Sequence, residues 1–185
     1  MNTHETALAC LPTQNEWAVI QSLSANLLPS GMLPAHIKTP EAAAAIILKG
    51  RELGIPPMQA LSGIASINGK PVCGSELMLA IIYRDHGDSA IWIDDTTDTF
   101  CRISYARRGW PERKTYSFSM EDAKRAGVAG GQTWQKYPAA MLRARCISAV
   151  ARMAFPDSIG GMYSPDELGG EVVVESDGET VSFNP

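Results

Sequence analysis

Apolar residues recur at intervals of three and four along several stretches of the chain, and this spacing places them on one face of a helix. The stretch 15–28 shows the pattern plainly. A second helix has clear boundary residues, because Thr39 can cap it, Pro40 fits its first position and Gly54 fits the position after its last turn. The helices expected on these grounds cover residues 15–28, 40–53, 58–62, 75–83 (capped by Ser75), 119–127 (capped by Ser119) and 138–154.

Short apolar runs between turn residues predict strands. Asn68 and Gly69 separate two such runs, 64–67 and 70–73, and an Asn-Gly pair in this setting is the strongest local signal for a β-hairpin. Three further runs follow, separated by turns, and suggest an antiparallel meander over 89–94, 100–107 and 114–118. The predicted fold class is therefore α+β, a small antiparallel β-sheet (hairpin plus three-stranded meander) packed with about five helices.

The helix expected at 138–154 combines a core face with basic flanks. Its core face is predicted to hold Leu142, Cys146, Ala149 and Met153. Arg145 and Arg152 lie seven residues apart and nearly aligned along one flank of that face, and Arg143 falls on the opposite flank.

Length and composition suggest one folded domain over residues 15–168, preceded by a flexible leader (1–14) and followed by an acidic, mobile tail (169–185). Within the tail, residues 171–174 could instead add a strand. No apolar run is long enough to span a membrane and no secretory signal is visible, so a cytoplasmic protein is expected. The four cysteines are scattered, which speaks against a zinc site.

Charge is unevenly distributed. Residues 102–152 hold eleven lysines and arginines and three acids, a net charge of +8, although the whole chain carries −4. Binding responds to the local field, so the chain average does not exclude nucleic acid as a ligand. The same segment contains Trp110, Trp134 and Tyr137. Cations interleaved with aromatic rings favour a surface for single-stranded nucleic acid.

Catalytic motifs are absent from the sequence. It has no HExxH, GxSxG or Walker A pattern. Asp94, Asp95 and Asp98 could hold a metal, but a cluster of acids in a turn is more often simply solvated. No catalytic residue, metal site or cofactor is therefore predicted, and a metal-dependent nuclease stays the weaker alternative.

Several binding candidates also have a structural explanation. Arg102 and Arg113 could belong to a solvated sheet face, and Trp134 and Tyr137 could be core residues instead of base stackers. Arg145 and Arg152 are stronger candidates, because two cations aligned two turns apart match the spacing of successive phosphates to within an order of magnitude.

The segment from Trp134 to Asp157, continuing to Glu167, resembles the phage RecT/Redβ (Bet) family of single-strand annealing proteins. The residues that match the family pattern are Trp134, Pro138, Met141, Leu142, Arg143, Arg145, Ala151, Arg152, Phe155, Gly161, Tyr163 and Glu167. A looser match extends upstream through the helix 41–53 and the hairpin at Asn68, so that the order of elements agrees over residues 15–168.

The resemblance implies a protein that binds single-stranded DNA in a basic groove and anneals complementary strands without ATP, in phage-type homologous recombination and DNA repair in a bacterial host. It also implies a homo-oligomer, as a ring or helical filament, and the annealed duplex as an intermediate. The DNA-binding residues carried over from the resemblance are Lys70, Arg102, Arg113, Lys136, Arg143, Arg145 and Arg152, with Trp134 and Tyr137 as stackers.

Family members generally carry a further C-terminal region that contacts an exonuclease and the host single-strand-binding protein, whereas only a short acidic tail follows Glu167 here. These partners therefore stay open. A nucleic-acid-binding regulator that does not anneal, built on the same scaffold, is the main alternative function.

Overall fold

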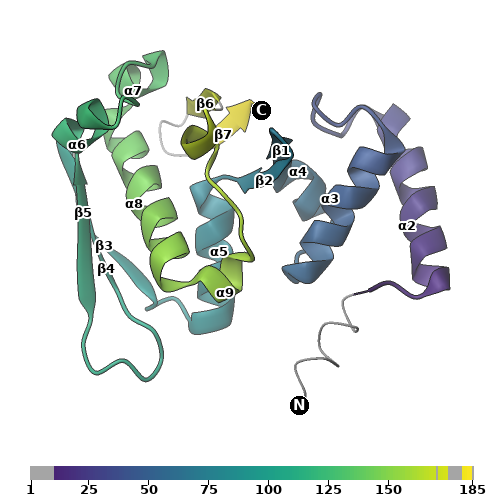
Figure 1. Cartoon of the computed structure of the whole chain (residues 1–185), viewed down its shortest axis with the longest axis horizontal. Coiled ribbons are helices and arrows are strands. Elements are labelled where there is room, and N and C mark those ends of the chain that lie inside the picture. The colour runs from purple at the N-terminus through teal and green to yellow at the C-terminus, as the bar shows by residue number, and fades with distance from the viewer. Residues whose placement is uncertain (1–10, 170, 175–180, 185) are drawn as a thin grey trace. The chain divides into compact units, whose positions relative to one another are not determined.

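The computed structural model describes residues 11–169, 171–174 and 181–184, and the chain divides into two compact units, residues 1–65 and 66–185. Figure 1 labels the elements. The described helices are α2 (Gln14–Leu27), η1 (Leu28–Ser30), α3 (Pro40–Glu52), α4 (Pro57–Gly63), α5 (Ser75–His86), α6 (Met120–Arg125), α7 (Gln132–Lys136), α8 (Pro138–Ala154), α9 (Pro156–Ile159) and η2 (Pro165–Leu168). The described strands are β1 (Ile64–Ile67), β2 (Lys70–Cys73), β3 (Ile91–Thr96), β4 (Phe100–Tyr105), β5 (Lys114–Ser119), β6 (Glu171–Val174) and β7 (Val181–Asn184). This arrangement confirms the predicted α+β class.

The first unit is a helical layer built on α2 and α3. Thr13 begins α2 with a capping box, in which its backbone N–H donates to Glu16 at 2.8 Å and its hydroxyl accepts from the Glu16 N–H at 3.3 Å. Arg51 on α3 donates to the same carboxylate at 3.1 Å. The two helices enclose a small apolar core made of Ile20, Ile37, Ala43, Ala44, Ile47 and Leu61.

The boundaries predicted for α3 are confirmed. The hydroxyl of Thr39 accepts from the Ala42 N–H at 3.2 Å, and Gly54 adopts a φ of +64° just beyond the last turn. Gly50 allows a close approach to α4, since a Cβ built at this position would lie 2.4 Å from the Cβ of Ala60. A side chain at residue 50 would therefore force the two helices apart.

The hairpin predicted at Asn68 is also confirmed. Strands β1 and β2 pair as a two-stranded sheet. Asn68 and Gly69 have φ values of +52° and +74°. Positive φ at both central residues is what a type I′ turn requires, which explains why this dipeptide directs the chain back on itself.

In the second unit, α8 packs against one face of the meander β3–β4–β5. Strand β4 is the central strand and pairs antiparallel with both neighbours. Its Cys101, Ile103 and Tyr105 are buried, and the Cys146 thiol of α8 donates to the Cys101 carbonyl at 3.4 Å. Figure 1 shows α8 lying along the sheet, with α5 on its other side. The bounds of α8 agree with the predicted range 138–154.

Several details of the second unit correct the predictions. Ser75 does not cap α5; it is the first residue of the helix, which follows Gly74 and continues to His86. The strand predicted over 89–94 runs from Ile91 to Thr96 as β3, so Asp95 also belongs to the strand and not to the turn after it. Met153, predicted to lie in the core, is 56% exposed, because Val150, Ala151 and Ala154 form the buried side of the last turn of α8 and Met153 lies off it.

Other differences concern short elements. Neither α7 nor α9 was expected from the pattern, since helices of four or five residues are too short to show a period. Residues 171–174 form a strand, as the alternative for the tail allowed, and pair with β7. The expected leader 1–14 lies largely outside the described residues, and the limits of the predicted DNA-binding domain stay a prediction.

Candidate nucleic-acid interface

The ring of Tyr163 brings together two cations that are far apart in sequence. The Lys70 ammonium lies 5.1 Å from the centre of the ring, and the Arg152 guanidinium lies 4.4 Å from it. Both distances fall within the range in which a cation is attracted to an aromatic face. We refer to Lys70, Arg152 and Tyr163 as the tyrosine cluster.

Backbone pairing explains how the cluster is formed. Tyr163 N–H donates to the Pro71 carbonyl at 3.1 Å, and Cys73 N–H donates to the Tyr163 carbonyl at 3.0 Å. These bonds fix the segment after α9 alongside β2, so the hairpin residue Lys70 lies close to the last turns of α8. Each of the three side chains therefore comes from a different element, and only tertiary structure could bring them together.

Two acids neutralise part of this surface. Arg145 forms an ion pair with Asp166 at 2.9 Å and lies 3.7 Å from Glu167, while Arg152 forms an ion pair with Glu167 at 2.7 Å. Glu167 also accepts from the Ser164 N–H at 3.0 Å. The local charge is therefore much lower than the basic segment suggests, because both arginines already hold carboxylates where phosphates were expected.

The two arginines differ in what they leave accessible. The Arg145 side chain is 22% exposed, and its guanidinium also lies 5.8 Å from the centre of the Phe118 ring. The Arg152 side chain is 39% exposed. Arg145 thus holds η2 and β5 against α8, whereas Arg152 keeps more of its guanidinium at the surface for a further anion.

Lys136 and Tyr137 form a second, smaller group at the junction of α7 and α8. The Lys136 ammonium lies 5.0 Å from the centre of the Tyr137 ring, which is half-buried. Trp134 is only 5% exposed, so its faces are occupied by protein in this structure. Its burial favours the core role that the sequence left as an alternative, and its assignment as a stacker stays a prediction.

The other nominated cations lie elsewhere. Arg102 is exposed on the face of the sheet that points away from α8, beside the Phe100 ring at 5.8 Å. Arg113 donates to the Ser89 carbonyl at 2.6 Å. Arg143 is half-buried on α8. The structure therefore brings Lys70 and Arg152 together, with Arg145 close by, but it does not bring Arg102 to their side of the sheet.

Sequence reasoning did not nominate Tyr163 as a binding residue, although Tyr163 is part of the family pattern. It also did not anticipate that Asp166 and Glu167 would pair with the arginines of α8. Arg107, counted in the basic segment, is committed to Asp157 through contacts of 2.8 and 2.6 Å and to the Ala154 carbonyl at 3.1 Å. The only available signal for these pairings was that acids follow α8 closely, which does not specify partners.

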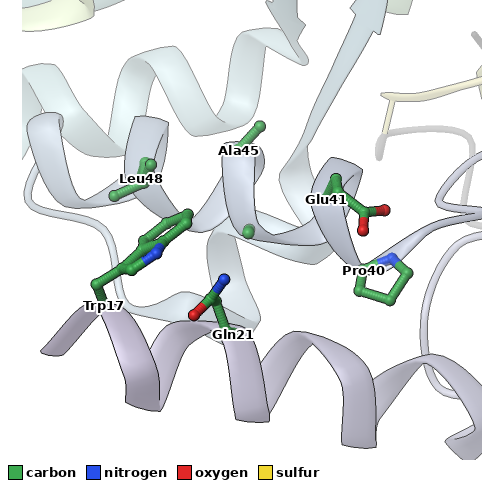
Figure 2. Close-up of a pocket in the computed structure, with 7 residues that line it drawn as sticks. Trp17, Gln21, Pro40, Glu41, Ala45 and Leu48 are labelled. Carbon is green, nitrogen blue, oxygen red and sulfur yellow. The ribbon is translucent and has the colours of Figure 1, made fainter. Parts of the chain in front are cut away.

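A groove in the first unit does not fit phosphate. Figure 2 shows it between α2 and α3, with Trp17 and Gln21 facing Pro40, Glu41, Ala45 and Leu48. Its volume is about 350 Å³, and its lining is mostly apolar with one carboxylate and no cation. An anion would lose its hydration there without a compensating charge.

Two other kinds of feature are absent from the described part of the chain. No helix there is long and apolar enough to cross a membrane. No three His, Cys, Asp or Glu side chains gather there in an arrangement that could hold a metal ion.

Comparison with known proteins gives one family. A model described as the RecT family matches residues 80–180, more than half of the chain. The matched range includes the meander, α8 and Tyr163, and it begins after Lys70. A comparison with curated proteins finds no match.

Proposed function

This chain belongs to the RecT family, and from that premise we propose that it binds single-stranded DNA and anneals complementary strands without hydrolysing a nucleotide. Family membership supports a role in single-strand annealing during DNA recombination. The finer proposals are ATP independence, direct DNA binding by this chain, a non-catalytic role and assembly of several copies on DNA.

The tyrosine cluster is the observation that best supports the site. Annealing needs a surface that neutralises phosphates and leaves base edges free to pair. Lys70 and Arg152 supply charge beside the ring, and the half-buried Tyr163 supplies an aromatic surface against which a base can stack. Specificity then comes from base pairing between the strands and not from contacts of the protein with base edges.

The supporting residues have graded roles in this proposal. Lys136 with Tyr137 extends the binding surface along the start of α8. Arg145 positions η2. Arg143 and Arg113 contribute to the positive field that attracts DNA without contacting a phosphate directly. Arg102 lies on the other side of the sheet, so it contacts DNA only if the strand passes from one copy to the next.

The test is annealing of two complementary oligonucleotides, followed by fluorescence quenching without ATP. Wild-type protein should accelerate annealing. Lys70→Ala with Arg152→Ala should lower single-strand affinity about tenfold or more and reduce the slope of log K against log salt by about 0.7 for each phosphate that the variant no longer binds. Lys38→Ala with Arg84→Ala removes the same charge outside the basic segment and should behave as wild type.

Two results would count against the proposal. Wild-type single-strand affinity and salt slope in a folded Lys70→Ala, Arg152→Ala variant would exclude the tyrosine cluster as the site. Tight single-strand binding by the wild type without any acceleration of annealing would favour the non-annealing regulator.

A further inference from the structure

The meander has two open edges. The order β3–β4–β5 leaves β3 and β5 each with one unpaired side, and no other strand among the described residues pairs with them. An open edge exposes a surface that proteins either protect or use for association. The side chains at these two edges differ in character and in charge.

The β3 side is aromatic and acidic. Trp92 is 61% exposed and Ile93 is 38% exposed. Asp94, Asp95 and, in the following turn, Asp98 are also exposed. A tryptophan left largely in solvent carries a large apolar area, and tryptophan is enriched among the residues that dominate protein–protein interfaces. We call Trp92, Ile93, Asp94, Asp95 and Asp98 the acidic edge.

Nucleic acid is a poor occupant for the acidic edge. Asp94 and Asp95 follow Trp92 on the same strand, and their carboxylates disfavour the phosphates of a strand whose base stacked on the ring. Backbone pairing with another strand is also disfavoured, because the register of β3 shifts between Ile93 and Asp95, and a bulge together with acids is a common way to block strand addition. The fitting partner is a folded surface with basic side chains.

Such a surface lies on the opposite edge of the same sheet. Lys114 begins β5, and Lys124 lies near the end of α6, which follows β5 directly. Both are exposed, and neither forms an ion pair among the described residues. We call Lys114 and Lys124 the basic edge. Neither lysine belongs to the tyrosine cluster.

The strand register shows which residues of the two edges lie at the same height along the strands. Trp92 is level with Ser104 and Thr115 across the sheet, and Asp95 is level with Arg102 and Ser117. If a second copy lies beside the first, displaced perpendicular to the strands, Trp92 of one copy would lie near Thr115 and Lys114 of the other. Asp95 and Asp98 of the first copy would then lie near the end of β5 of the second, where α6 begins.

We propose that the acidic edge of one copy docks on the basic edge of the next, with Trp92 as the apolar anchor. The two surfaces differ, so the contact is heterologous, and repetition of such a contact gives rings or filaments. This inference rests on the proposed function only in assuming that several copies act together. It adds the surface through which they would associate.

Charge exchange tests the pairing directly. One variant carries Asp95→Lys with Asp98→Lys, and the other carries Lys114→Glu with Lys124→Glu. Each variant alone presents like charges at every contact, so its midpoint concentration for self-association should rise more than tenfold in sedimentation velocity at low salt. An equimolar mixture restores opposite charges at both kinds of contact and should assemble as the wild type does. Trp92→Ala should also weaken assembly.

Controls separate the interface from folding and from DNA binding. Asp88→Lys with Glu112→Lys makes the same change in net charge outside the acidic edge and should not impair assembly. Thermal unfolding verifies that each variant is folded. Binding to a short single-stranded oligonucleotide should be retained by both exchanged variants, because the tyrosine cluster is intact.

Three outcomes would overturn the interface: a wild-type chain that stays monomeric at every concentration, normal assembly by either exchanged variant alone, or two impaired variants that do not recover on mixing. None of these depends on annealing. A wild type that assembles but neither binds nor anneals single strands would instead refute the proposed function and leave the interface standing.

Discussion

Arg152 and Glu167 form an ion pair of 2.7 Å, although the sequence separates them by a helix end and a turn. The Glu167 side chain is only 14% exposed, and the same carboxylate lies 3.7 Å from Arg145. An acid in this position pairs with Arg152 and lies near Arg145, two cations that a phosphate could otherwise contact. On the proposed function, Glu167 limits how strongly this surface would bind DNA, and its ion pairs hold η2 on α8.

Replacing Glu167 should strengthen DNA binding and weaken the fold. Glu167→Gln removes the charge that competes with phosphate, so single-strand affinity at low salt should rise about threefold to tenfold, and the salt slope should steepen by about 0.7 if Arg152 then binds one more phosphate. Loss of a partly buried ion pair should cost about 1–3 kcal/mol of unfolding free energy. Fluorescence anisotropy across a salt series and chemical denaturation measure the two effects.

Asp157→Asn is the matched control for that change. It removes an acid paired with Arg107, outside the tyrosine cluster, and should leave DNA affinity unchanged. If Glu167→Gln gives the same affinity and slope as the control, Arg152 has a structural role alone.

Tyr163 should contribute through its ring and not through its hydroxyl. Tyr163→Phe keeps the ring beside Lys70 and Arg152, so single-strand affinity should stay within about twofold of wild type. Tyr163→Leu removes the ring, and loss of one base–aromatic stack should cost about 1–3 kcal/mol of binding. Equal affinities for the two variants would show that no base stacks at this position.

The first unit offers a stability test that does not involve DNA. Gly50→Ala places a methyl group where a Cβ would lie 2.4 Å from that of Ala60, so α3 and α4 must separate. We expect a loss of about 1–3 kcal/mol, typical of overpacking. Gly130→Ala is the control, because nothing lies within 4 Å of a Cβ built there. Denaturation midpoints that are equal for the two variants would contradict the close approach.

Glu16 should give the fold an acid-sensitive contribution. Hydrogen bonds from the Thr13 backbone, from Arg51 and from the Thr13 hydroxyl lower the pKa of Glu16 from 4.5 to about 2. A carboxylate whose pKa is depressed on folding stabilises the folded state above the unfolded pKa and loses that contribution as pH falls through the folded pKa. The contribution should be complete above pH 4.5 and lost between pH 4.5 and about 2.

Thermal unfolding of Glu16→Gln across pH measures this effect. The variant should melt below wild type near neutral pH, and the two melting temperatures should converge as the pH approaches about 2. A difference that is independent of pH would mean that the charge of Glu16 contributes nothing beyond its hydrogen bonds.

Local sequence signals determined most of the secondary structure. The bounds of α8, the caps of α3 and α6, and the β1–β2 turn at Asn68 depend on neighbouring residues, and short-range sterics and hydrogen bonding are sufficient to set them. Where these signals were weak, the predictions failed. Ser75 had the chemistry of a cap, but the chain had already turned into the helix, and α7 was too short to show a period.

The concentration of positive charge, the family pattern around α8 and the absence of catalytic motifs were determined by the sequence alone, because composition and spacing need no coordinates. Tertiary structure decided which charges are available. Pairing of β2 with residue 163 placed Lys70 beside Arg152, and the turn after α9 returned Asp166 and Glu167 to the arginines of α8. Ion pairs and cation–ring contacts depend on distances of a few ångströms between residues far apart in sequence, and only the packed chain fixes those distances.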